Sequence, residues 1–152
     1  MASDRWRAAD ACLLFFFFVL PSLGAAAEPE QPLATVAQPA VVTATPAAGA
    51  AMRAGASAQV VINVTGFQPG QDGPVQAVVK AQRDGKEREI GRFGIFPHIA
   101  FKAADPSQGQ SFAIPLPRDL ASGGPVKFNV YLVPANGEGK GARMEIGGAE
   151  IR

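Results

Sequence analysis

Apolar and polar residues alternate with a period of two over several short stretches in the second half of the chain. The clearest stretch is residues 126–133, VKFNVYLV. Successive side chains of a β-strand point to opposite faces, so this pattern predicts a half-buried strand. We expect Phe128 to lie in the core and Tyr131 on the polar face.

Similar short stretches recur along the chain, separated by turn residues. Gly (17) and Pro (13) are abundant, which argues against a mainly helical protein. Asp84-Gly85 is typical of a two-residue hairpin turn, because both positions tolerate a positive φ. We predict a single helical turn at residues 118–121. The remaining predicted strands are residues 58–64, 75–82, 87–96, 111–114, 142–146 and 149–151.

These elements predict an all-β fold, a small antiparallel β-sandwich of six or seven strands over residues 58–152. Gly91 and Gly94 lie within one predicted strand, which indicates a bulge or a close backbone approach. The expected core residues are the inward-facing members of the strands: Ile62, Val64, Val78, Phe128, Val130, Leu132 and Ile146.

Residues 28–57 differ from this domain in composition. They consist mainly of Ala, Pro, Val, Thr and Gly, contain no aromatic residue, and carry prolines at positions 29, 32, 39 and 46. A segment of this kind buries little apolar surface, so we predict a disordered linker between the N-terminus and the sandwich. The alternative is a short strand at residues 40–45, AVVTAT.

The first 27 residues have the three parts of a secretory signal peptide. Arg5 and Arg7 precede an apolar run over residues 11–20, and a small-residue segment ends at Ala27. Ten apolar residues are too few for a spanning helix, which needs about 20. We therefore expect cleavage after Ala27 and a periplasmic or secreted mature chain. The alternative is an uncleaved membrane anchor.

Composition limits the chemistry that the chain can perform. Lys and Arg (14) balance Asp and Glu (13), so no basic excess points to nucleic acid. Cys12 is the sole cysteine and His98 the sole histidine, which argues against disulfides and His-built metal sites. Nucleophile-elbow and phosphate-loop motifs are missing. We expect a protein that is not an enzyme and needs no metal or cofactor. Glu87 and Glu89 are most simply interpreted as a solvated strand edge.

The aromatic residues give the one candidate binding site. Phe93, Phe96 and Phe101 cluster around Pro97 and His98. Such a group either lines the core or forms an exposed anchor for another protein's pocket. We expect Phe93 in the core, and we predict partner binding by Phe96, Pro97, His98 and Phe101.

Four motifs follow one another in an order that resembles a known family. They are GRFGIFPH (91–98), FAIPLPRDL (112–120), VYLVP (130–134) and MEIGGAEI (144–151). The chain resembles the C-terminal domain of plant-type polyphenol oxidases and bacterial tyrosinase-like proteins over roughly residues 59–152. The family's KFDV element would fall on residues 76–79, QAVV, so that motif is missing here.

The resemblance implies a β domain that shields the entrance of a di-copper site. The 152 residues contain no copper-binding domain, so we expect an accessory or shielding module that binds a separate protein, such as a copper oxidase. Phe96 is the candidate shielding residue. Two other functions stay open: a small periplasmic metal or ligand carrier, and a structural, envelope-associated domain.

Overall fold

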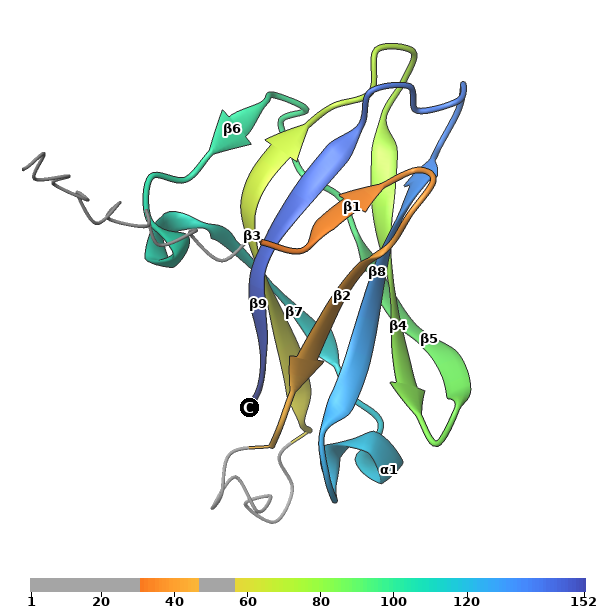
Figure 1. Ribbon diagram of the computed structural model, residues 1–152, viewed down its shortest axis with the longest axis vertical. Coiled ribbons are helices and arrows are strands. Elements are labelled where there is room, and N and C mark those ends of the chain that lie inside the picture. Colours follow the sequence, from red (N-terminus) through yellow and green to blue (C-terminus); the bar gives the residue numbers. More distant parts are fainter. Residues whose placement is uncertain (1–30, 47–56) are drawn as a thin grey trace, which may run out of the picture.

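The computed structural model of the chain describes residues 31–46 and 57–152 (Figure 1). The predicted signal peptide, with Ala27, lies outside the described residues. In chain order the elements are β1 (Leu33–Thr35), β2 (Ala40–Ala44), β3 (Gln59–Gln68), β4 (Val75–Arg83), β5 (Lys86–Phe93), β6 (Phe101–Lys102), the 3-10 turn η1 (Pro106–Gln108), β7 (Gln110–Pro115), α1 (Arg118–Ala121), β8 (Val126–Pro134) and β9 (Arg143–Ile151).

The strands form two antiparallel sheets that pack face to face, as the all-β sandwich prediction requires. The first sheet has the order β1-β9-β3-β6, and β7 also pairs with β3. The second sheet has the order β2-β8-β4-β5. Figure 1 shows β6 at one end of the molecule and α1 at the other. The short helix at residues 118–121 confirms the predicted helical turn.

The core lies between the sheets and contains six of the seven residues that alternation assigned to it. Phe128, Val130, Ile62 and Ile146 are completely buried. Val64 and Leu132 belong to the same cluster. Val78 is also buried but stands apart from that cluster, because it pairs with Tyr131 and Arg92 on the outer face of the second sheet.

The predicted linker is wrong over residues 33–44, where the structure has two strands. β1 pairs with β9 in the first sheet, and β2 pairs with β8 in the second. The alternative, a short strand at residues 40–45, is therefore what the structure shows. These strands are three and five residues long, and they are stabilised by pairing with β8 and β9, which local composition does not reveal.

Two local features were predicted at the correct positions. Asp84 (φ 51°) and Gly85 (φ 76°) join β4 to β5 in a two-residue turn. Gly91 lies beside a bulge in β5, and a Cβ there would meet Ile114 Cγ2 at 2.6 Å. The same prediction is wrong for Gly94, which lies beyond the end of β5 and has no atom within 4 Å of an added Cβ. The two predicted strands at the C-terminus are instead one strand, β9, interrupted by a register shift near Gly147.

Contacts between the two sheets close one side of the sandwich. Phe93 of β5 is buried, as predicted, and its ring stacks on Phe112 of β7 with centroids 4.1 Å apart. On the other side, the β1–β2 connection carries the chain from one sheet to the other. Within the described residues, no helix is long and apolar enough to cross a membrane.

Candidate functional site

The segment between β5 and β6 is held by a buried residue at one end and a half-buried residue at the other. Ile95 is 2% exposed, and Phe101 packs partly against the core. β6 pairs with β3, and the Ala103 N–H donates to the Thr65 carbonyl at 2.7 Å. We call residues 96–100 the aromatic loop. Its two anchors fix where the intervening side chains emerge.

The aromatic loop carries the two most exposed large apolar side chains of the described residues. Phe96 is 86% exposed and Ile99 is 65% exposed. The His98 ring meets the Phe96 ring edge-on, with centroids 6.2 Å apart. The Ile99 N–H donates to the Pro97 carbonyl at 2.8 Å, which closes a tight turn. The loop is therefore compact, with apolar groups facing solvent.

The structure brings the four predicted partner-binding residues together but gives them different environments. Phe96, Pro97 and His98 are exposed on the loop. Phe101 is half-buried against the core, so it supports the loop more than it extends from it. Of the four predicted residues, only Phe96, Pro97 and His98 therefore expose most of their side chain to a partner.

A surface trough lies beside the aromatic loop on the outer face of the first sheet. Its volume is about 490 Å³. Phe67 points into the core, so its neighbours Gly66 and Gln68 face outward. Gly66 pairs with Lys102 on one side and with Glu145 on the other. The trough is lined by Gly66, Phe67, Gln68, Ala100, Phe101, Lys102, Arg143 and Glu145.

A second polar group lies on the outer face of the second sheet, centred on Glu87. The Glu87 carboxylate accepts hydrogen bonds from Asn129 Nδ2 (2.7 Å) and Tyr131 OH (2.9 Å). Lys80 Nζ lies 3.2 Å from Glu87 Oε2 and 4.6 Å from the centre of the Tyr131 ring. Glu87 and Glu89 are exposed on the edge strand β5, as the sequence indicated, and Glu87 in addition joins three side chains from the two neighbouring strands.

These hydrogen bonds change the acidity of the groups that they join. The Asn129 hydrogen bond, with those from Tyr131 and Lys80, lowers the pKa of Glu87 despite partial desolvation. The hydrogen bond to Glu87 raises the pKa of Tyr131. Both side chains are thus held in their ordinary neutral-pH forms, carboxylate and phenol. This favours a structural role for the group over proton transfer.

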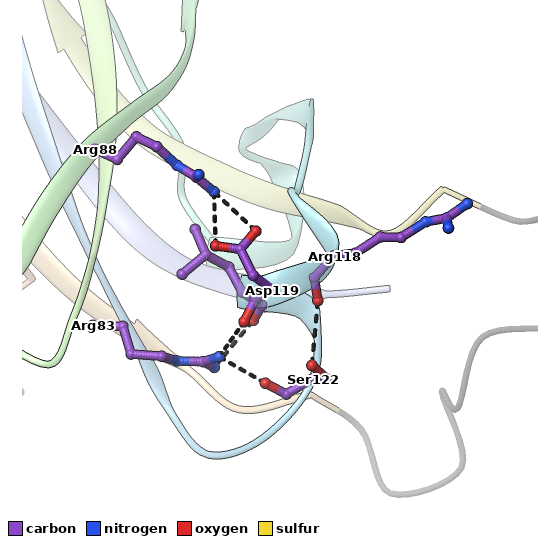
Figure 2. Close-up of polar contacts among 6 residues, drawn as sticks. Arg83, Arg88, Arg118, Asp119 and Ser122 are labelled. Carbon is purple, nitrogen blue, oxygen red and sulfur yellow. Dashed lines mark hydrogen bonds and ion pairs between the residues drawn. The ribbon is translucent and has the colours of Figure 1, made fainter.

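Arg83 connects the β4–β5 hairpin to α1 (Figure 2). Its guanidinium donates to four backbone carbonyls at 2.6–3.1 Å, those of Asp119, Leu120, Ser122 and Gly124. Arg88 adds an ion pair with Asp119 at 3.1 Å. The backbone carbonyls at the C-terminal end of α1 thus accept hydrogen bonds from Arg83, a side chain of β4 in the second sheet.

The described residues contain no cluster of metal-ligating side chains. Among residues 31–46 and 57–152, no three His, Cys, Asp or Glu side chains are placed to hold a metal ion. No family model, curated protein or solved structure matches this chain.

Sequence reasoning missed the trough and the Arg83 contacts for different reasons. The strand β6 has only two residues, too few to show any alternation. Gly66, which follows a β-branched run, was the one local indication of the trough. A glycine in a strand has no side chain and leaves a gap on the sheet face. Nothing local to Arg83 indicates the carbonyls of a segment 36–41 residues away.

Proposed function

We propose that this protein is a non-enzymatic β-sandwich module that binds another protein through the aromatic loop. The observation that carries the proposal is the exposure of Phe96 (86%) and Ile99 (65%) on a loop anchored at both ends. Exposed aromatic side chains at a fixed position commonly act as anchors in a partner's pocket. Because the loop is compact, little conformational entropy is lost on binding.

The role that we propose for the module is accessory or shielding. It is supported by the motif order that resembles the C-terminal domain of polyphenol oxidases, in which Phe96 belongs to the GRFGIFPH motif (91–98). We further propose a periplasmic or secreted location, because the first 27 residues have the pattern of a signal peptide. A copper oxidase is the partner that this resemblance implies.

The proposal is tested by capture of partners on immobilised protein from the periplasmic and secreted fractions of the native host. We expect Phe96→Ala to reduce capture of a discrete partner at least about tenfold, because an aromatic anchor is removed. Val133→Ala is the matched control, since Val133 is an exposed apolar residue (41%) on the second sheet.

Thermal melting of the same proteins separates binding from folding. We expect Phe96→Ala to have the same melting temperature as the wild type, because the exposed Phe96 side chain makes few packing contacts. A mutant that melts early would mean that Phe96 stabilises the fold. A folded mutant with undiminished capture would place the binding surface elsewhere.

A further inference from the structure

The trough beside the aromatic loop carries more positive than negative charge. Lys102 lies 3.2 Å from Glu145, yet its side chain is still 74% exposed. Arg143 is exposed and has no ion-pair partner among the described residues. One acidic group therefore faces two basic groups, and the Arg143 guanidinium is available to an anion from outside the molecule.

The outer face of the second sheet provides a contrast. There Lys80 pairs with Glu87 at 3.2 Å, and Arg92 pairs with Glu89 at 2.7 Å. Each of these basic groups is matched by its own carboxylate. Lys127 of β8 is the exception on that face, since it is exposed and has no ion-pair partner among the described residues, and it therefore serves below as the control.

The trough and the aromatic loop form one continuous surface. Ala100 belongs to the loop and also lines the trough, and Phe101 and Lys102 follow it directly in β6. An extended chain that runs along the trough would therefore reach Ile99 and Phe96 within a few residues. Apolar and cationic features lie within the span of one short peptide.

We propose that this surface binds an extended acidic segment of a partner protein. In this arrangement an apolar side chain of the segment packs on Phe96 and Ile99, and a carboxylate accepts hydrogen bonds from the Arg143 guanidinium. The guanidinium fork matches a carboxylate in geometry as well as charge. The proposal rests on the proposed function and adds the chemistry of the partner. A basic segment is disfavoured by repulsion from Arg143 and Lys102.

The probe is a short synthetic peptide with two leucines flanked on both sides by glutamates, labelled with a fluorophore. Two matched peptides replace the glutamates by lysines or the leucines by serines. Binding to the full chain is measured by fluorescence anisotropy at low and at high salt. We expect the glutamate–leucine peptide to bind best, and its affinity to fall with salt.

Three variants connect this binding to the surface. Arg143→Glu and Phe96→Ala should each weaken binding of the glutamate–leucine peptide at least about fivefold. Lys127→Glu is the control of matched charge reversal, because Lys127 is an exposed residue of β8 in the other sheet, and it should change affinity less than about twofold. Melting curves of all variants confirm that they are folded.

Failure of this proposal is distinguishable from failure of the proposed function. No binding of the glutamate–leucine peptide, equal binding of the lysine peptide, or insensitivity to Arg143→Glu would overturn the acidic-segment proposal. If Phe96→Ala still abolishes capture of the natural partner while Arg143→Glu does not, the aromatic loop binds that partner through another chemistry.

Discussion

Individual side chains along β8 show that alternation predicts direction but not burial. Phe128 points inward and is completely buried, as expected. Asn129 points to the outer face and is nevertheless only 8% exposed, because it donates to Glu87 in the neighbouring group. A polar residue on an outer face can thus be buried when a carboxylate from another strand satisfies its hydrogen bonds.

The first prediction compares the two faces of β8. Phe128→Ala should lower the free energy of unfolding by about 3–5 kcal/mol, because it leaves a cavity in the core. Tyr131→Ala should cost much less, about 1 kcal/mol, because it removes one hydrogen bond and a partly exposed ring. Equal melting temperatures of the two variants would contradict the assignment of faces.

The second prediction concerns the pH dependence of the Glu87 group. The folded-state pKa of Glu87 is lowered, chiefly by the Asn129 hydrogen bond, so the carboxylate stabilises the fold above its unfolded pKa. This stability is lost as the pH falls through the folded-state pKa. The stability difference between wild type and Glu87→Gln should therefore be largest at neutral pH and shrink from about pH 5 to about pH 3. Denaturant titrations across this range measure it, and a constant difference would contradict the role of the charge.

At the scale of elements, long alternating strands could be predicted and short ones could not. Residues 75–83 and 126–134 have enough alternation to identify β4 and β8 almost to the residue. By contrast, β1, β2 and β6 have two to five residues and depend on neighbours that are distant in sequence. Their pairing energy comes from tertiary contacts, which composition does not encode.

The third prediction tests the connection of α1 to the hairpin (Figure 2). Arg83→Ala removes the donors of four carbonyls and should lower the free energy of unfolding by about 1–3 kcal/mol. Arg88→Ala is the matched control, since its ion pair with Asp119 is solvent-exposed and should contribute only about 0–1 kcal/mol. A larger cost for Arg88→Ala in urea unfolding would mean that the charge pair, and not the carbonyl contacts, holds α1.

For the whole molecule, the sandwich begins before residue 57. The strands β1 and β2 join different sheets, so the chain crosses between the sheets at residues 36–39. The segment buries Ala34, Ala40, Val42 and Ala44 in the common core. The Ala- and Pro-rich composition concealed these strands, because small side chains give only a weak alternation of hydropathy. The burial of these residues becomes visible only once their pairing with β8 and β9 is known.

The fourth prediction follows from this boundary. A chain that begins at residue 57 lacks β1 and β2 and leaves the edges of β8 and β9 unpaired, so it should be less stable or fail to fold. A chain that begins at Glu28 retains both strands and should unfold like the full-length protein. Urea unfolding of the two chains measures the difference. Equal stability would show that the two strands contribute nothing to the fold.

The aromatic loop marks the limit of prediction for the candidate site. Sequence reasoning brought Phe96, Pro97, His98 and Phe101 together, but a loop has no period from which to infer which ring is exposed. The structure separates them because Ile95 and Phe101 are held by the core, which leaves Phe96 outside. The adjoining charges of Lys102 and Arg143 come from strands that are 41 residues apart and were not predicted to meet.

Photo-crosslinking at position 96 tests the central claim most directly. A photoreactive benzoyl-phenylalanine replaces Phe96 in the native host, and the same residue at position 133 on the second sheet serves as the control. We predict one discrete adduct with a partner protein from position 96 and none from position 133. Adducts of equal yield from both positions, or none from position 96 in a folded protein, would contradict binding through the aromatic loop.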